Sequence, residues 1–242
     1  MSLKFNGQTP SKIKLNGNEI NKIKYNGNVI YTSTPPIVYP TKGDLINIDI
    51  KGNGTPIQFR VLKNVNDTTF EIVSSSQMVQ SPFGSTNTYE NSLIDVKINT
   101  TLYDTFSTTA KNAIVDKNIS QYSYTSNQNV YNATTHASWA QYNTKTLVGT
   151  MTRHCYLLDV EDVETYYSNV FSTSDLYDTF FGHTSCALRS KVTSSSSPTL
   201  YIWWFNSAYK YIHYNGVSST SNLYGLVAMQ IDLSKIPFSY VT

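Results

Sequence analysis

A ten-residue repeat near the N-terminus is the feature that most constrains the fold. Residues 11–20 read SKIKLNGNEI and residues 21–30 read NKIKYNGNVI, with a partial earlier copy at 4–7. Asn-Gly favours a type I′ turn because both central residues of that turn need positive φ, and the flanking Lys-Ile-Lys segments alternate as strands do. We therefore expect residues 3–32 to form a small meander of short hairpins.

So small a module has little apolar surface of its own to bury. Two-stranded ribbons are marginally stable in water, so we expect the module to need a partner surface or neighbouring chains, and hence to act as an anchor. The strand positions expected to make that contact are Ile13, Leu15, Ile23 and Tyr25. The alternative is a hairpin decoration folded onto the chain's own domain.

A proline-containing connector follows the module. Residues 34–36 read Thr-Pro-Pro and Pro40 comes soon after, which stiffens the backbone and removes amide donors. The rest of the chain is long enough to bury a sizeable core. The predicted domains are a hairpin module at 1–33, a linker at 34–43 and a globular α+β domain at 44–242.

Alternating apolar residues at 44–50, 57–62 and 70–74 predict three antiparallel strands in the globular part. Residues 155–158 have the pattern of a buried strand. The polar stretch at 120–146, with its interleaved tyrosines, predicts either a long decorated loop or a pair of edge strands.

Helices are expected between residues 92 and 119, where apolar residues recur at three- and four-residue steps. We place a break near Asn99 and Thr100, and Ser107 and Thr108 can cap the second helix. A further helix is predicted at 160–166, capped by Asp159. After Arg189 we expect strands and loops to the end.

Five segments of the globular part carry a family resemblance: FRVL at 59–62, YENSL at 89–93, LYDTFS at 102–107 with Lys111, LLDVEDV at 157–163 with Tyr166, and ALRS at 187–190. In this order and rough spacing, across about residues 44–233, they resemble a domain family without assigned function from surface and phage proteins of Gram-positive bacteria. That family is similar in layout to C-type-lectin-like domains. The resemblance implies twisted antiparallel strands, two or three helices and a long loop region that displays a binding surface.

The chain departs from that family at two places. Cys186-Ala187 stands where the family has an aromatic pair, and GLVAM at 225–229 lacks the family's arginine. If that arginine forms an internal salt bridge, Arg189 serves another purpose here. The resemblance implies no catalytic role. The Asn-Gly repeats, in turn, look like the short modules that begin many phage tail and baseplate proteins.

The histidines and cysteines are not spaced as catalytic or metal sites require. His154 and Cys155 are adjacent, so on a strand they point to opposite faces and cannot easily share a proton. The 4 histidines have no paired spacing and the 2 cysteines form no metal motif. Cys155 and Cys186 form either one bridge or two buried free thiols. We expect no metal and no cofactor.

Four acidic residues lie close together in the predicted helix at 160–166 and its cap: Asp159, Glu161, Asp162 and Glu164. On a helix this spacing spreads them around the polar face, where solvated acids keep ordinary acidity. Capping and solubility explain them, so we expect no enzyme activity from them.

The densest aromatic run, YIWWF at 201–205, is followed by further tyrosines. On a strand, alternate side chains point to opposite faces, and core packing is the favoured interpretation of the run as a whole; the alternative is that one set fills the core and the other is displayed. Displayed tyrosine and tryptophan suit stacking on sugar rings or anchoring of a protein partner. The candidate ligand-binding residues are Trp203, Tyr209, Tyr211 and Tyr214. Asn215-Gly216 predicts another hairpin turn.

The composition argues against binding of nucleic acid and against insertion into a membrane. Charged residues make up 14% of the chain, against about 25% in an ordinary soluble domain. A net charge of +2 without a Lys/Arg run gives no footprint for nucleic acid or anionic lipid. No stretch reaches the ~20 apolar residues of a membrane span, and we expect no signal peptide. We therefore expect neither nucleic acid nor membrane insertion.

A surface of Tyr, Asn, Ser and Thr on a chain without an expected export signal favours a protein made in a host cytoplasm and released in a phage particle. The leading hypothesis is a non-enzymatic virion structural protein of the tail, baseplate, collar or head fibre. Residues 1–33 would dock onto other virion proteins, as a homo-oligomer, and the outward domain would either decorate the particle or touch the host surface, where glycan is the candidate ligand. The alternatives are a virion-associated enzyme that degrades the cell envelope and a purely architectural subunit.

Overall fold

In the computed structural model, the chain divides into two units, Met1–Tyr39 and Pro40–Thr242. The structure describes residues 12–15, 18–20, 22–32, 37–125, 131–132, 145–163, 186–193, 201–206, 211–216 and 223–241. The division between the units falls within residues 34–43.

The N-terminal repeats form two hairpins, whose paired strands are β1 (Lys14–Leu15) with β2 (Asn18–Glu19) and β3 (Lys22–Tyr25) with β4 (Asn28–Thr32). In the second turn, Asn26 and Gly27 have φ values of 48° and 77°, the positive values that a type I′ turn needs. The predicted turn is therefore confirmed there. The predicted short hairpins are therefore present, and among the described residues each of them is a separate two-stranded sheet. Residues 3–11 lie outside the described residues.

No described side chain of this first unit is buried. Tyr25 is 60% exposed and Val29 is 46% exposed. A two-stranded ribbon has a single layer, so both of its faces stay open unless another surface covers them. The half-buried apolar side chains are those of Ile13, Ile20, Ile23 and Ile30.

The second unit contains a seven-stranded antiparallel sheet in the order β13-β18-β7-β6-β5-β19, with β9 also pairing to β18. Its strands are β5 (Leu45–Ile48), β6 (Ile57–Asn64), β7 (Thr69–Ser74), β9 (Ile114–Val115), β13 (Cys155–Tyr156), β18 (Ala228–Asp232) and β19 (Ser239–Tyr240). The three strands predicted at 44–50, 57–62 and 70–74 are confirmed as β5, β6 and β7. The predicted buried strand at 155–158 is shorter than expected, although all four residues are buried.

A six-stranded sheet follows the order β11-β16-β15-β14-β10-β12, and its one parallel pair is β10 with β14. Its strands are β10 (Lys117–Thr125), β11 (Tyr131–Asn132), β12 (Lys145–Arg153), β14 (Cys186–Thr193), β15 (Tyr201–Asn206) and β16 (Tyr211–Gly216). The ends of the 120–146 stretch are thus paired strands, with β12 at the edge and β10 inside the sheet. The turn predicted at Asn215-Gly216 is wrong, because both residues pair with β15.

The helices are α1 (Leu93–Lys97), the π-helix η1 (Ile98–Leu102) and α2 (Thr108–Ala113). The predicted break at Asn99 and Thr100 is wrong: their side chains donate to the carbonyls of residues four positions earlier, and the helix widens instead of ending. The chain breaks before Ser107, whose Oγ accepts from the Ala110 N–H at 3.1 Å and caps α2 as predicted. Residues 114–115 and 117–119 lie in strands where helix was expected.

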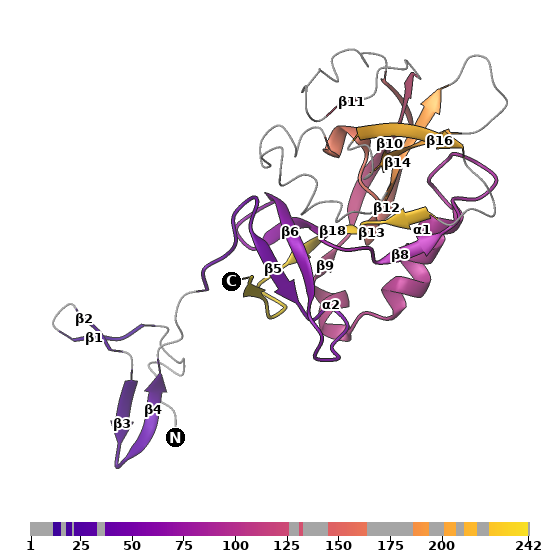
Figure 1. Cartoon of the computed structure of the whole chain (residues 1–242). Coiled ribbons are helices and arrows are strands. Elements are labelled where there is room, and N and C mark those ends of the chain that lie inside the picture. The colour runs from indigo at the N-terminus through magenta and orange to yellow at the C-terminus, as the bar shows by residue number, and fades with distance from the viewer. Residues whose placement is uncertain are drawn as a thin grey trace. The chain divides into compact units, whose positions relative to one another are not determined.

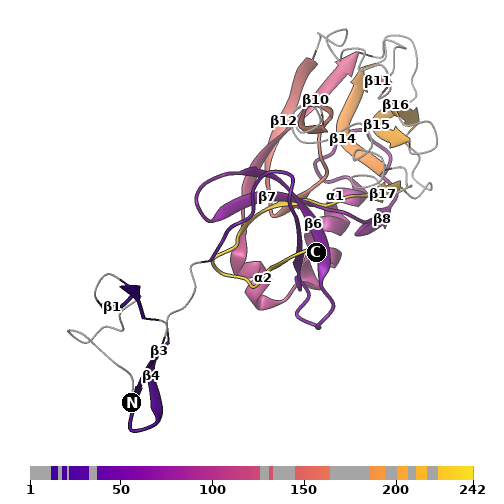
Figure 2. The ribbon, with the colours of Figure 1, turned by 60° about the vertical axis from the view of Figure 1, so that its left-hand side comes forward.

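Helix α1 and a small two-stranded sheet lie between the two large sheets, whereas α2 lies beside the seven-stranded sheet, away from the six-stranded one (Figure 1). In both views the seven-stranded and six-stranded sheets occupy different ends of the second unit, with α1 and β8 (Val79–Ser81) between them (Figure 1, Figure 2). β8 pairs with β17 (Leu223–Gly225). A Cβ at Gly225 would lie 2.7 Å from the side chains of both Leu157 and Val79, so this close packing requires glycine. The described part of the unit is therefore a mostly antiparallel β fold with short helices.

A two-stranded ribbon crosses from one large sheet to the other. β9 ends at Val115 and β10 begins at Lys117, so Asp116 alone separates them. His154 alone separates β12 from β13 in the same way. Since Lys117 pairs with Arg153, and both β9 and β13 pair with β18, the two single residues lie opposite each other at the bend of the ribbon.

Candidate functional site

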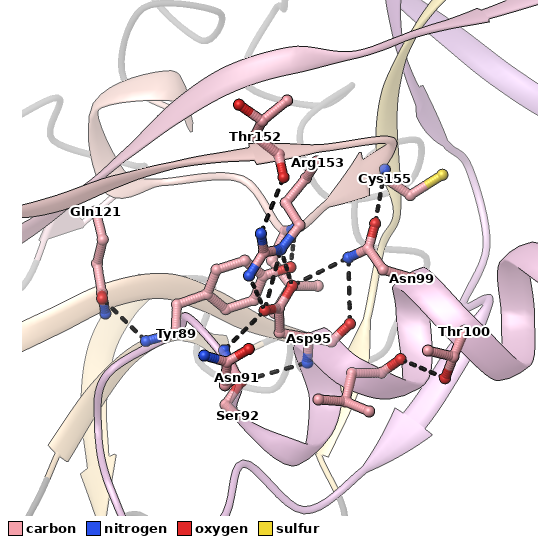
Figure 3. Close-up of polar contacts among 12 residues, drawn as sticks. Tyr89, Asn91, Ser92, Asp95, Asn99, Thr100, Gln121, Thr152, Arg153 and Cys155 are labelled. Atoms are coloured by element: carbon pink, nitrogen blue, oxygen red, sulfur yellow. Dashed lines mark hydrogen bonds and ion pairs between the residues drawn. The ribbon is translucent and has the colours of Figure 1, made fainter.

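A cleft of about 320 Å³ opens where α1 and η1 meet the bend of this ribbon. Its volume lies at the lower end of the range of about 300–1,000 Å³ that is typical of small-molecule sites. The side chains converge on it from both helical turns and from the end of β12 (Figure 3). We call it the polar cleft, and its lining residues are Asn91, Asp95, Val96, Asn99, Thr100, Asp116, Thr152, Arg153 and His154.

A bidentate ion pair forms the floor of the polar cleft. The Arg153 Nε donates to Asp95 Oδ1 at 2.9 Å, and the Arg153 Nη2 donates to Asp95 Oδ2 at 2.7 Å. The Asp95 side chain is 3% exposed and that of Arg153 is 17% exposed. The hydrogen bonds and charge of Asp95 raise the pKa of Arg153 against the opposing effect of burial. This charge-assisted fork fixes α1 against β12.

Asn91 and Ser92 fix the entry to α1. The Ser92 Oγ accepts from the Asp95 N–H at 3.3 Å, while Asp95 Oδ2 accepts from the Asn91 N–H at 2.9 Å. Asn91 has a φ of 61°, in the left-handed region that asparagine tolerates better than most residues. These bonds leave the Asn91 side chain on the wall of the cleft.

Asn99 joins the helical segment to the ribbon (Figure 3). Its Nδ2 donates to Asp95 Oδ1 at 3.0 Å, and its Oδ1 accepts from the Cys155 N–H at 3.2 Å. The Asp95 carboxylate therefore accepts hydrogen bonds from three different segments. A carboxylate satisfied in this way stabilises the site but is not left to act as a base.

The rim of the cleft carries a His–Asp pair at the bend of the ribbon. The His154 Nδ1 contacts Asp116 Oδ1, and the His154 ring stacks on Tyr103 with centroids 4.4 Å apart and planes 9° apart. The side chains of His154 and Asp116 are 41% and 56% exposed. The imidazole is thus held in one orientation with an edge open to solvent.

The neighbouring cysteine takes no part in this arrangement. Cys155 is fully buried, and burial raises the pKa of its thiol, which disfavours the thiolate. His154 instead contacts Asp116 and Tyr103. Both cysteines are buried free thiols, which decides between the two alternatives for Cys155 and Cys186.

The acidic cluster after β13 differs from its prediction. Asp159 is 1% exposed, and Asp162 pairs with the buried Arg189 at 2.6 Å. Arg189 also donates to the carbonyls of Leu157 and Ser120. The prediction that these acids sit solvated around a polar face is wrong for Asp159 and Asp162, because the helical turn at 160–163 packs against β14. Glu164 lies outside the described residues.

The pKa values of Asp159 and Asp162 are shifted in opposite directions. Desolvation raises the pKa of Asp159 and outweighs the opposing effect of the Arg189 charge. Asp159 Oδ1 accepts hydrogen bonds from Tyr124 Oη at 2.7 Å and from the Glu161 N–H at 3.0 Å, and the second of these caps the helical turn. Desolvation also opposes ionisation of Asp162, but the Arg189 charge and the Asp159 N–H together hold its pKa below the usual range. Glu161 is on the surface and pairs with Lys145.

The sequence-predicted ligand residues fall on β15 and β16 or outside the described residues. Trp203 of β15 pairs in register with Tyr214 of β16, and Tyr211 pairs with Asn206. Only the backbone of these strands is described, and Tyr209 lies outside the described residues. Among the predicted docking residues, Ile13 and Ile23 are half-buried, Tyr25 is exposed and Leu15 is placed by its backbone in β1.

Sequence reasoning did not find the polar cleft. Its residues come from positions 91–100, 116 and 152–154, and they meet because the ribbon bends beside α1. One local signal was present: Ser92 and Asp95 have the spacing of a capping box. That signal marks a helix start and gives no hint of an arginine 58 residues away.

Comparison with known proteins found no relative: no protein-family model, no curated protein sequence and no solved structure matches the chain. The class of molecule is therefore given by its own geometry, a hairpin unit followed by a mostly antiparallel β unit with a polar cleft. Within the described part, no helix has the length and apolar character to cross a membrane. No group of three potential metal-binding side chains gathers among those same residues.

Proposed function

We propose that this chain is a phage virion structural protein that docks through its N-terminal hairpins and displays an outward binding unit. The tail, baseplate, collar and head fibre are the locations that fit such a part. The observation that carries the proposal is the open surface of the hairpin unit, in which no described side chain is buried. An ordered ribbon with both faces open gains its stability from a partner surface.

The docking face is defined by strand alternation. In β3, Ile23 and Tyr25 share one face, while Lys22 and Lys24 share the other. The repeat places Ile13 and Leu15 at the corresponding positions of the first hairpin. We propose that these four apolar residues contact other virion proteins and that several copies of the chain assemble together there.

The C-type-lectin-like layout of the second unit is part of this proposal. It is supported by the family resemblance and by the presence of antiparallel sheets and short helices in the same unit. On this view the segments around β15 and β16, with Trp203, Tyr209, Tyr211 and Tyr214, belong to the displayed region and contact host surface glycan.

The competing hypothesis is a virion-associated enzyme that degrades the cell envelope, motivated by the same location and by the carboxylates at 159–164. Of these, Asp159 is buried and Asp162 is bound to Arg189, whereas the Glu161 side chain is partly exposed. A purely architectural subunit remains the second candidate function, because open hairpins suit any role inside a particle.

Localisation tests the proposal directly. Mass spectrometry of density-gradient-purified particles, made by the phage or prophage that encodes the chain, should find it in a fixed ratio to the major structural proteins. Immunogold labelling should place it at one part of the particle. Absence of the chain from purified particles would show that it is not a virion component.

A matched pair of variants tests the docking face. Replacing Ile23 and Tyr25 together by serine should lower the copy number per particle at least about tenfold, since loss of a few apolar anchors dominates binding energy. Lys24→Ser, on the opposite face of the same strand, should leave incorporation unchanged. Equal incorporation of both variants would exclude this face as the contact.

A further inference from the structure

Several groups that line the polar cleft are already hydrogen-bonded to one another. Asp95 holds Arg153, Asn91 and Asn99 in one network, and Asn99 continues it to the backbone of β13. The His154 ring is fixed by Asp116 and Tyr103. A site whose walls are already ordered loses little conformational entropy when a ligand binds.

The charge of the cleft excludes a strongly anionic ligand. The guanidinium of Arg153 is already neutralised by Asp95, and Asp116 places a second carboxylate on the rim. A phosphate or carboxylate ligand would meet no unpaired cation there and would be repelled by Asp116. A neutral polar ligand meets no such repulsion and can use the hydrogen-bonding groups that line the cleft.

The hydrogen-bonding groups left for a ligand include both donors and acceptors. A guanidinium has five N–H donors. In Arg153, the Nε and one Nη2 hydrogen are donated to Asp95, and one Nη1 hydrogen is donated to the Thr152 carbonyl. The other two N–H donors are left for a ligand. The Asn91 side-chain amide makes no hydrogen bond to another described residue. The His154 Nε2 and Asp116 Oδ2 are likewise left on the rim. Such a mixture suits hydroxyl groups, each of which both donates and accepts.

The cleft also offers a small apolar patch. Val96 is 45% exposed on its wall, next to the methyl-bearing Thr100. The C–H face of a sugar ring can cover such a patch while its hydroxyls reach the polar groups on the other walls.

We infer that the polar cleft binds a neutral saccharide through Asn91, Arg153 and His154. The inference rests on the proposed function for its biological setting, a displayed unit that contacts host glycan. It names a location different from the aromatic strands β15 and β16. The binding chemistry itself is a property of the isolated chain and is measured without any particle.

The test is a titration of the ¹⁵N-labelled full-length chain with methyl α-glucoside, methyl α-galactoside and N-acetylglucosamine. At up to about 50 mM, well above a Kd of about 1 mM for a weak site, at least one sugar should shift the Asn91 side-chain amide and the Arg153 Nε–H signals with saturation. Inorganic phosphate at the same ionic strength should not.

Two variants remove ligand contacts while keeping the fold. Asn91→Gly removes the side-chain amide, and glycine adopts the φ of 61° at this position without strain. His154→Phe keeps an aromatic ring on Tyr103 and removes Nε2. Each should weaken sugar binding by up to about tenfold, the value of one hydrogen bond. Asn64→Ala, at an exposed asparagine at the end of β6, should bind as the parent does.

Three results would overturn the inference: no saturable shift with any of the sugars, shifts confined to residues away from the cleft, or stronger response to phosphate. None of them bears on whether the chain is present in virions. Conversely, absence from virions with intact sugar binding would reject the proposed function and leave the cleft assignment standing.

Discussion

At the scale of single residues, Asp159 and Asp162 show how burial separates two neighbouring acids. Both lie beside Arg189, but Asp162 forms the ion pair, whereas Asp159 Oδ2 is buried without a hydrogen-bond partner among the described residues. Desolvation therefore dominates at Asp159, and the cation dominates at Asp162.

We predict that Asp162→Asn destabilises the chain by about 3 kcal/mol at pH 7.5, because it leaves a buried arginine without its counter-charge. Asp159→Asn should cost less than about 1 kcal/mol, since Tyr124 and the Glu161 N–H can still donate to the amide oxygen. Urea denaturation of both variants measures the difference. Equal losses would contradict the assigned roles.

The pH dependence has opposite signs at the two aspartates. Because the pKa of Asp159 is higher in the folded than in the unfolded chain, protonated Asp159 favours the folded state. This stabilisation is complete below the unfolded-state pKa of about 3.9 and is lost as pH rises through the folded-state pKa. The lowered pKa of Asp162 gives a contribution that is present above about 3.9 and is lost as pH falls through the folded pKa. The stability of Asp159→Asn relative to the parent should therefore rise between pH 4 and pH 7.5.

At the scale of elements, α2 depends on its N-cap. The Ser107 Oγ satisfies the Ala110 N–H, which has no partner within the helix at that end. We predict that Ser107→Ala lowers the free energy of unfolding by about 1 kcal/mol. Thr108→Ala, at the exposed first helical residue, is the control and should be neutral or slightly stabilising, because alanine has the higher helix propensity. Denaturant midpoints decide between them.

Local patterns predicted the elements whose causes are local. The period of two in β5, β6 and β7, the Asn26-Gly27 turn and the Ser107 cap each depend on residues a few positions apart. The widening of the helix at η1 was not predictable in this way. It depends on the Asn99 side chain bonding both to Asp95 and to the backbone of Cys155, which is distant in sequence.

The same reason explains the strands and the cleft that were missed. Residues 114–119 follow a helical pattern, but pairing of β9 with β18 and of β10 with β12 overrides it. Asp159 was predicted as a cap, which it is, yet its burial depends on Arg189 and Tyr124. Features made by contacts between distant segments were therefore the ones that sequence reasoning could not supply.

At the scale of the whole molecule, the chain consists of two separately compact units. We predict that a chain spanning residues 40–242 has the same melting temperature as the full chain within about 2 °C, because the described hairpins bury no side chain and add no core. Differential scanning calorimetry measures this. A drop of more than about 5 °C would show that the hairpins are a decoration folded onto the second unit, the alternative considered from the sequence.

The pairing around β5 determines how the second unit carries mechanical load. β5 is the first strand after the linker, and it is hydrogen-bonded along both edges, to β6 on one side and to the C-terminal β19 on the other. The Val241 N–H also donates to the Leu45 carbonyl at 3.1 Å. If the proposed docking loads the chain along the axis of β5, we expect that force to be resisted by backbone hydrogen bonds along both edges of the strand, including those made by β19 and Val241.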